Sequence, residues 1–375
     1  MDLNRQLRSA SRRVATLTTG LLFATPLLAQ EGDKPKEPPT PEKIAEWKNE
    51  AQERPLFKSD ETIVLTITGN FKVISRDRDT LSTKEYWGEV TLPAVNGSPE
   101  VKLPIQLRTR GHYRLTQRNC NFVPLRLDFV KKETTGTPFE GQDKLKLVTH
   151  CNSNAMFDEY VIREYLVYRV HNTLTPRSYR ARLARVTYVD SATGKPIETR
   201  NGMFLEHEDD VAKRMEGEIA ELRGALFDNV EAPQLNEVAL FQWFIGNTDW
   251  SLYALHNIRL VRRLDGAILP ISYDPDFSGL VATRYATPDP RLGIRSVKDR
   301  LYRGPCRTME EYEPHLTVYR EKEAEILELY KTFPGLDGRY RQETERFLKD
   351  FFTLLGRQRD LKATLVDACK QQPSV

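Results

Sequence analysis

The sequence predicts an α+β chain of two lobes, with a β-rich N-terminal lobe and a mostly helical C-terminal lobe. From about residue 60 to residue 130, β-branched and aliphatic residues alternate with polar ones, and turn signals separate the runs. Apolar residues in the 154–175 segment recur at spacings of three and four residues, which indicates a helix. Beyond residue 310 helical patterns dominate, so we expect helices to make up most of the C-terminal part.

The first residues are typical of a secretory signal peptide. Four arginines precede an apolar run of 16 residues that contains Pro26, and polar residues follow it. The run is too short for a comfortable membrane span, and we expect cleavage after Ala29. The stretch "SRRVATL" also resembles a twin-arginine signal. These features predict an exported protein, periplasmic or extracellular after cleavage of residues 1–29. An uncleaved N-terminal anchor is the alternative.

The rest of the chain divides into three parts, which are a linker with a short helix at 30–55, the β-rich lobe with a central helix at 56–210, and the mostly helical lobe at 211–375. In the β-rich lobe we expect a helix at 154–175 and strands at 61–74, 88–95, 101–111, 122–130, 180–190 and 203–210. In the C-terminal lobe we expect a hairpin at 256–274 and helices at 211–227, 232–246, 319–333 and 342–369.

The charge balance argues against nucleic acid as a partner. The whole chain carries a net charge of +3, and the leader alone carries the same charge, so the mature part is neutral. A neutral chain lacks the basic footprint of a nucleic-acid-binding protein. No other apolar run approaches the length of a membrane span, so we expect no transmembrane segment in the mature chain.

Four cysteines remain after the leader, and an even number in an exported protein suggests disulfides. Four cysteines allow three pairings, and their positions along the chain favour Cys120 with Cys151 and Cys306 with Cys369. Each bond should stabilise the fold by ~3–4 kcal/mol in the chain-entropy model. Buried free thiols are the alternative. No spacing typical of a zinc site is present.

A polar loop and a hairpin follow the apolar helix that ends at Gly246. Asp265 and Gly266 lie between two strand-like runs and predict a two-residue hairpin turn. Such a turn would place Asn257 opposite Asp274, where an amide oxygen and a carboxylate could share one Mg²⁺ ion. A bulge at Pro270 in the second strand would shift this register, and a slip of one residue would put the two side chains on opposite faces. The alternative is that both are strand-end residues without a metal.

Asp249 is a third polar group in this region. A carboxylate on a loop just after a buried helix can accept a proton from a substrate hydroxyl, and an Asx-turn that holds the "GNTD" bend is the alternative. Taken with Asn257 and Asp274, it gives the order of a catalytic-loop Asp, a metal-binding Asn, a hairpin and a metal-binding Asp. That order is typical of kinase-type phosphoryl transfer.

Five segments in order resemble the spore-coat-protein-H family of atypical kinases. They are "RTRG" at 108–111, "FDEYVIREYLVYRV" followed by "SYRARLARVTYVD", "GMFLEHEDDVAKRM", "GNTDW" with the later "HN", and "PISYDPDFSG". The resemblance implies a two-lobed protein-kinase-like fold, with the catalytic loop and the metal-binding hairpin in the C-terminal lobe. It also implies ATP with Mg or Mn, and an acceptor that is a protein, a sugar or a small molecule.

Carried over residue by residue, the resemblance implies a role for each matching position. Asp249 would be the catalytic base, Asn257 and Asp274 would bind the metal, and Asp276 would be a second metal-binding carboxylate. Arg126 would contact the nucleotide phosphates, with Lys144 and Lys146 as rivals, and Glu159 or Glu164 on the central helix would pair with that cation.

Two departures from the family pattern leave other functions open. Asp249 and Asn257 are eight residues apart, whereas the corresponding kinase spacing is about five. An arginine also stands where kinases use a lysine, and the two side chains are not interchangeable. The alternatives are a kinase-like binding or structural protein of the cell envelope without catalysis, and an envelope hydrolase that uses the same carboxylates.

Overall fold

The computed structural model describes residues 39–95 and 97–369. The signal peptide and the cleavage after Ala29 lie outside the described residues. From Pro39 onward the chain makes one compact unit.

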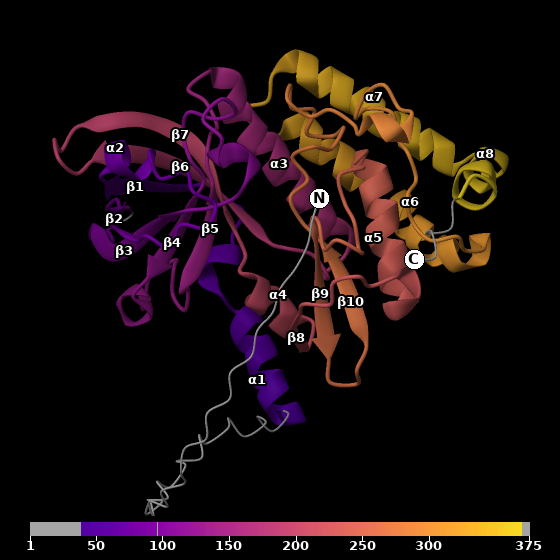
Figure 1. Ribbon diagram of the computed structural model, residues 1–375, viewed down its shortest axis with the longest axis horizontal. Coiled ribbons are helices and arrows are strands. Elements are labelled where there is room, and N and C mark those ends of the chain that lie inside the picture. The colour runs from indigo at the N-terminus through magenta and orange to yellow at the C-terminus, as the bar shows by residue number, and fades with distance from the viewer. Residues whose placement is uncertain (1–38, 96, 370–375) are drawn as a thin grey trace, which may run out of the picture. The chain divides into compact units, whose positions relative to one another are not determined.

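Seven strands close into a β-barrel in the order β1-β2-β3-β4-β5-β7-β6 (Figure 1). All neighbours are antiparallel except β1 and β6, whose parallel pairing closes the barrel. Apolar side chains alternate with polar ones along each strand and fill the interior; in β3, for example, Leu103, Ile105 and Leu107 are buried. The strands are β1 Ile63–Gly69, β2 Tyr86–Leu92, β3 Val101–Thr109, β4 Leu125–Phe129, β5 Lys144–Val148, β6 Ala181–Asp190 and β7 Pro196–Leu205.

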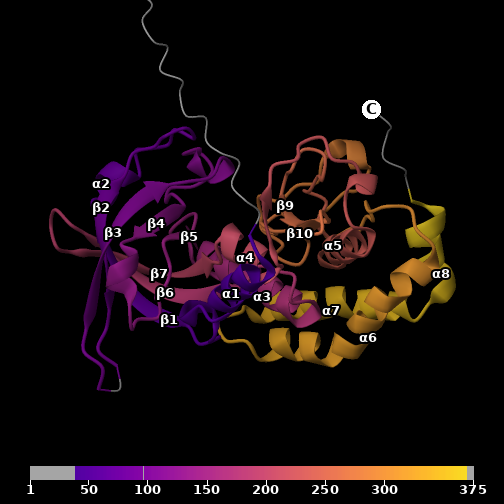
Figure 2. The ribbon, with the colours of Figure 1, turned by 90° about the horizontal axis from the view of Figure 1, so that it is seen from below.

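A second sheet of three strands follows in the order β10-β9-β8, formed by β8 Gly217–Ala220, β9 Ile258–Arg263 and β10 Ile268–Ser272. Figure 2 shows it beside the helices of the C-terminal part. The α-helices are α1 Pro41–Gln52, α2 Phe71–Ile74, α3 Ala155–Leu174, α4 Glu208–Arg214, α5 Ala232–Ile245, α6 Met309–Thr332, α7 Gly338–Leu355 and α8 Gln358–Lys362. Short 3-10 turns lie at Pro55–Phe57, Tyr113–Leu115, Lys131–Thr134, Phe227–Asn229 and Pro290–Leu292, and a π turn at Ala363–Asp367.

The predicted two-lobed, protein-kinase-like fold with a mostly helical C-terminal lobe is wrong. The N-terminal strands form a closed mixed barrel, and the C-terminal part contains a sheet as well as helices. Alternation along a strand reports which residues face a core, but it does not report the partner strand. Ile63 pairs with Ala184, far along the chain, and that pairing closes the barrel. The predicted helix at 211–227 is also wrong, because it contains the end of α4 and all of β8.

Two apolar helices, α3 and α5, are largely buried, and α3 connects the barrel to the C-terminal part. The central helix α3 contacts β6 and β7 of the barrel on one side and α6 on the other, so its middle is buried on nearly all faces. The helix α5 is similarly buried and ends at Gly246, whose φ is +66°. A Cβ at that glycine would lie 2.9 Å from Val297 O, so only glycine fits. This close approach fixes where the following loop begins.

Both predicted disulfides are confirmed. Cys120 pairs with Cys151 and Cys306 with Cys369, with Cα–Cα distances of 4.6 and 5.5 Å, and no free cysteine remains in the described residues. Among residues 39–95 and 97–369, no helix has the length and apolar character that a membrane crossing requires.

Candidate functional site

The β9–β10 hairpin has Asn257 at one strand end and Asp274 at the other, but the two residues are not paired. Ser272 lies opposite Ile258, and Tyr273 N donates to Asn257 O at 3.1 Å. Asn257 therefore faces Tyr273, and the predicted pairing of Asn257 with Asp274 is wrong by one residue.

The turn explains the shift. It contains three residues, 264–266, rather than the predicted two, because Arg263 N donates to Ala267 O at 2.9 Å. Gly266 has a φ of +84°, the left-handed conformation that closes three-residue hairpin loops. Pro270 keeps its place in the ladder, so it is not the cause of the shift.

Both residues nevertheless leave the regular strand conformation at this point. Asn257 and Asp274 have φ values of +53° and +58°, which asparagine and aspartate tolerate better than most residues. Such conformations cluster at functional sites, where the surrounding structure holds them in place. Asn257 is buried, and its Nδ2 donates to Asp249 O at 2.7 Å and to Asp249 Oδ2 at 3.2 Å. Its amide oxygen has no hydrogen bond within the described chain.

The carboxylate of Asp249 accepts a hydrogen bond from Asn257 and does not form an Asx-turn. The turn is made by Asn247, whose Oδ1 accepts from Asp249 N at 2.9 Å. The half-buried Asp249 side chain also lies 2.9 Å from His256 Nε2. The hydrogen bond from Asp249 raises the pKa of His256, and the charge of Asp274 adds to this effect. Asp249, His256, Asn257 and Asp274 therefore share one neighbourhood.

A buried ion network lies next to this group. Arg114 Nη2 donates to Asp276 at 3.0 Å, to Glu164 at 3.2 Å and to Tyr285 Oη at 3.4 Å, and Tyr285 Oη donates to Asp276 at 3.0 Å. Burial raises the pKa of Glu164 to about 8 and that of Asp276 to about 6, although Arg114 opposes both shifts. The negative charge of Asp274 contributes to both raised pKa values.

Asp274 and Arg110 make no ion pair with the described residues. The Asp274 carboxylate is exposed and makes no hydrogen bond or ion pair in the described part of the protein, while its backbone N donates to Tyr168 Oη at 3.0 Å. The half-buried guanidinium of Arg110 donates from Nε to Leu125 O at 3.2 Å, and its Nη atoms make no hydrogen bond with the described residues. Burial lowers the pKa of Arg110, and the charge of Asp274 opposes that shift. These two groups are free to take part in binding.

The predicted Lys146 lies at the edge of the same region. Its Nζ is 3.3 Å from Glu208, which also accepts from Arg259 Nε at 3.0 Å, and both cations lie over the ring of Tyr273. Burial lowers the pKa of Lys146, Glu208 opposes this shift, and Arg110 lowers the value further. Lys146 is therefore close enough to Arg110 for the two charges to interact.

Arg126 and Glu159 belong to other contacts. Arg126 Nη2 forms an ion pair with Asp128 at 2.5 Å, on the same strand. Glu159 pairs with Arg163 at 2.9 Å and accepts from Asp337 N at 3.1 Å. Neither shares a partner with the group around Asp274.

Several residues of the site had no assigned role at the sequence level, among them Arg110, Arg114 and Glu208. Arg110 and Glu208 lie inside two of the segments quoted for the family resemblance, so a signal for them existed. Arg114 lies in the short 3-10 turn after β3, and its partners come from α3 and from the loop after β10. Only the tertiary fold brings those elements together, so no local pattern could have identified Arg114.

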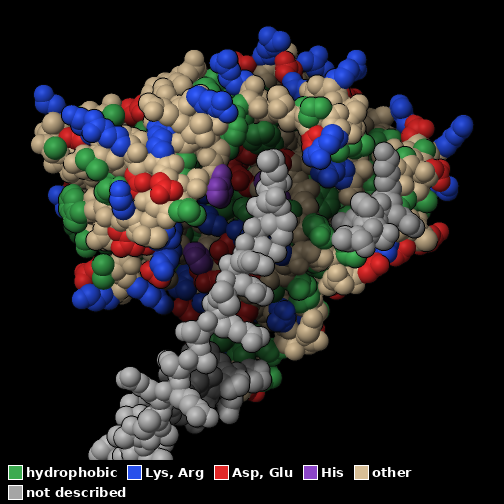
Figure 3. All heavy atoms as spheres, viewed as in Figure 1, with side chains coloured by type: hydrophobic (Ala, Val, Ile, Leu, Met, Phe, Trp, Pro, Cys, Tyr) green, Lys and Arg blue, Asp and Glu red, His purple; other side chains and the backbone are tan. Residues whose placement is uncertain are grey.

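A small cavity opens beside Asp249. Its volume is about 150 Å³, and its walls include Asp249, His256, Phe277, Asp289 and Arg303. Figure 3 shows acidic, basic and histidine side chains together on the face between the barrel and the C-terminal strands. The site thus combines carboxylates, an amide and guanidinium groups beside a cavity. Guanidinium groups can hold an anionic ligand, and a carboxylate can take a proton from a hydroxyl.

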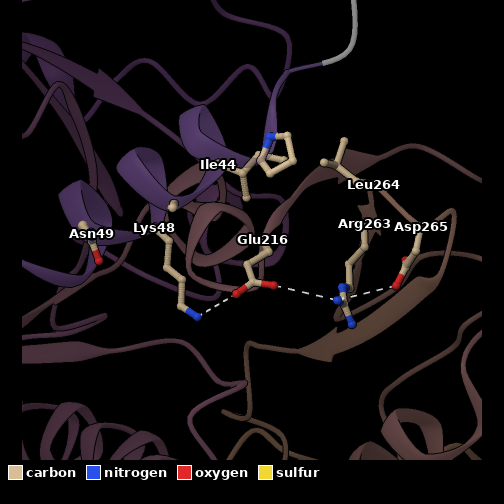
Figure 4. A pocket seen from close by; sticks show the side chains of 9 residues that line it. Ile44, Lys48, Asn49, Glu216, Arg263, Leu264 and Asp265 are labelled. Atoms are coloured by element: carbon tan, nitrogen blue, oxygen red, sulfur yellow. Dashed lines mark hydrogen bonds and ion pairs between the residues drawn. The ribbon is translucent and has the colours of Figure 1, made fainter.

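A second cavity, of about 510 Å³, shares no residue with this site. It lies between α1 and the tip of the β9–β10 hairpin (Figure 4). Its charged groups pair with one another, with Lys48 Nζ 2.7 Å from Glu216 and Arg263 Nη2 3.8 Å from Glu216 and 3.5 Å from Asp265. No reactive group is left unpaired there, so the region around Asp249 and Asp274 is the stronger candidate.

The residues predicted to bind a metal are Asn257, Asp274 and Asp276, and they do not form a complete metal site by themselves. In the described residues no group of three or more His, Cys, Asp or Glu side chains is arranged to hold a metal ion. A scan of the sequence against protein-family models and a search of curated proteins both gave no match. The resemblance to the spore-coat-protein-H family therefore stays a prediction.

Proposed function

We propose that this chain is an exported phosphotransferase that transfers a phosphoryl group from a nucleotide, with a divalent cation, to a hydroxyl acceptor. One observation carries the proposal: Asn257 fixes Asp249 through two hydrogen bonds, in the same region as the Asp274 carboxylate and the Arg110 Nη atoms, none of which has a hydrogen bond to the described residues. The proposal rests on these side chains and not on the fold.

The donor atoms suit a divalent cation that arrives with its ligand. The amide oxygen of Asn257 and the carboxylate of Asp274 are both without other partners in the described chain, and Mg²⁺ usually takes one or two protein oxygens together with phosphates and water. A bound Mg²⁺ or Mn²⁺ ion would neutralise charge on the phosphate oxygens. Asp276 is already bonded to Arg114 and Tyr285, so we assign it to the ion network and not to the cation.

Arg110 replaces Arg126 in the role of phosphate contact. Its Nη atoms are free to donate, and a guanidinium grips phosphate oxygens in a bidentate way. Lys146 is a secondary cation, because Glu208 already neutralises it. Arg126 is held by Asp128 and is not available.

Asp249 is positioned to act as the base. The acceptor oxygen attacks the terminal phosphorus, the hydroxyl proton passes to the Asp249 carboxylate, and the nucleoside diphosphate leaves with the electrons of the broken phosphorus–oxygen bond. The amide of Asn257 and the ring of His256 hold the carboxylate in one orientation for this transfer.

The proposed function includes a location outside the cytoplasm. The two disulfides favour an oxidising environment, which agrees with the predicted signal peptide. We therefore propose a periplasmic or extracellular location. N-terminal sequencing of protein from the cell envelope checks it, and Met1 intact on cytoplasmic protein contradicts it.

Nucleotide binding tests the activity directly. Oxidised mature protein should gain about 2.7 kcal/mol of stability when a nucleotide with Mg²⁺ or Mn²⁺ is present at 100 times its dissociation constant. Arg110→Gln should weaken binding about tenfold or more, whereas the matched control Arg126→Gln should leave it unchanged. If millimolar nucleotides with either cation do not shift the melting temperature, the proposal is wrong.

A non-catalytic binding protein is the second candidate. The observation that favours it is that both oxygens of the Asp249 carboxylate already accept hydrogen bonds or lie within bonding distance of His256. If the protein binds nucleotide but releases no nucleoside diphosphate with any acceptor tested, the result supports a non-catalytic binding protein.

A further inference from the structure

Two segments of the chain form most of the cavity beside Asp249. One side is the loop after α5, with Thr248, Asp249 and Trp250, and the other is the segment from Thr287 to Arg303. Its volume of about 150 Å³ is below the ~300–1,000 Å³ of pockets for drug-sized ligands. The part of a ligand that enters it is therefore small.

Arg303 connects the two sides. Its Nη1 donates to the carbonyl oxygens of Thr248 and Trp250, and its other N–H groups make no hydrogen bond with described residues. Burial lowers the pKa of Arg303, and the charges of Asp249 and Asp289 oppose this shift, which places the guanidinium near both carboxylates. A donor and two carboxylates thus border the same small space, and one of these carboxylates, that of Asp289, also pairs with Arg291.

The remaining walls add hydroxyl groups and rings. Thr287 contributes a hydroxyl group that makes no hydrogen bond in the described chain, and Trp250 and Phe277 contribute aromatic rings. Carboxylates and guanidinium groups bind neighbouring hydroxyls through paired hydrogen bonds, while aromatic rings contact the C–H groups of the same molecule. The combination suits a ligand that carries hydroxyl groups on a carbon skeleton.

We infer that this cavity binds a neutral monosaccharide or polyol, one hydroxyl of which is the acceptor of the phosphoryl group. The acceptor role rests on the function proposed above, but the binding of the polyol does not. In the transfer, the polyol oxygen forms the new bond to phosphorus, its proton passes to Asp249, and the nucleoside diphosphate is released.

A protein side chain fits the cavity less well. A serine or threonine hydroxyl could reach Asp249, but it would leave Thr287 and the free donors of Arg303 without partners, whereas Asp289 already pairs with Arg291. Polar groups that lose water without gaining a partner weaken binding. A monosaccharide supplies hydroxyls for both sides of the cavity.

The first arm of the test measures binding without nucleotide. Saturation-transfer NMR is recorded on the oxidised mature protein with a panel of neutral pentoses, hexoses and polyols. The variant Thr287→Val should weaken the bound sugar about tenfold, because it removes one hydrogen-bonding hydroxyl. The control Asp265→Asn, at the exposed hairpin tip, should bind as the wild type does. No binding by any member, or equal affinity in all variants, overturns the inference.

The second arm adds ATP and Mg²⁺ and follows the phosphate. A phosphorylated sugar supports the acceptor role. Phosphate on an added protein, with no sugar phosphorylated, overturns the acceptor role while the proposed function stands. Absence of any nucleotide binding overturns the proposed function and the acceptor role together, and the first arm then decides whether the cavity binds a sugar.

Discussion

A single guanidinium, that of Arg114, compensates two buried carboxylates. Glu164 and Asp276 lie 3.2 and 3.0 Å from it, and both carboxyl groups have a pKa raised by burial. Taking a carboxylate out of water is costly unless a cation and hydrogen bonds replace the water. The network therefore depends on Arg114 more than on either acid.

We expect Arg114→Met to destabilise the fold by about 3 kcal/mol, because it leaves two buried acids without their cation. The double variant Arg114→Met with Asp276→Asn should recover part of that loss at neutral pH, because Asp276, whose pKa is about 6, is then no longer charged. Urea unfolding measures both values. The control Lys349→Met breaks an exposed pair with Glu345 and should cost less than about 0.5 kcal/mol. A loss for Arg114→Met as small as the control's would show that the network is hydrated.

Asp249 should be needed for turnover and not for binding. Asp249→Asn keeps the size of the side chain and an oxygen that can accept a hydrogen bond, so the loop should stay folded. Loss of the base should lower kcat by about 10²–10⁴-fold with little change in nucleotide affinity. Steady-state release of nucleoside diphosphate, together with a nucleotide titration, separates the two effects. Turnover within threefold of the wild type contradicts the assignment.

Asp249, Asn257 and Asp274 were predicted from the expected hairpin register and from their order along the chain, which resembles that of kinases. Sequence reasoning could not select Arg114, whose turn has no periodic pattern. It selected Arg126 because a cation on that strand matched the family pattern, and a carboxylate two residues along the same strand neutralises it. Local sequence indicates which residues lie outside the core. The ion-pair partners of a charged side chain are set by the tertiary fold.

At the scale of the elements, the hairpin shows how one residue in a turn changes a register. The Asp-Gly signal correctly predicted a hairpin and its two strands, but Leu264 joins the turn and shifts the pairing. The segment 211–227 shows a different limit. It has helix-forming residues, yet Gly217 begins β8, which pairs with β9, so tertiary pairing overrides local propensity there.

Gly266 should be the sensitive position of that turn. With φ at +84°, Gly266→Ala puts a Cβ in a left-handed conformation and should cost about 1 kcal/mol. The matched control is Gly338→Ala in the first turn of α7, where φ is not in the left-handed region and no atom lies within 4 Å of the added Cβ. We expect that change to be neutral or stabilising by up to about 1 kcal/mol. Thermal or urea unfolding compares them, and equal effects would contradict the turn geometry.

At the scale of the whole molecule, barrel closure is the feature that sequence patterns could not reveal. Seven strands with alternating apolar residues suit an open sheet as well as a closed one. The parallel pairing of β1 with β6 decides between them, and it joins segments separated by more than one hundred residues. The closed barrel and the C-terminal helices meet at α3, so the stability of the whole unit depends on how that helix is buried.

The burial of His171 on α3 should make the whole unit sensitive to acid. Its ring stacks on Phe241 of α5 with centroids 3.7 Å apart, and its Nε2 is buried without a hydrogen bond in the described residues. Burial lowers the pKa of His171 from 6.5 to about 3. A histidine whose pKa is lower in the folded state stabilises the fold above the unfolded value of about 6.5, and this stability is lost as the pH falls from there toward 3.

The unfolded chain takes up one proton more than the folded chain in that window, which costs about 1.4 kcal/mol per pH unit. Between pH 6.5 and pH 4 the wild type should therefore lose about 3 kcal/mol more than His171→Leu, which cannot titrate and stays apolar. Urea unfolding at several pH values measures the difference, with His112→Leu as the control because His112 is exposed. Parallel pH curves for the wild type and His171→Leu would mean that the buried ring finds a partner when it is protonated.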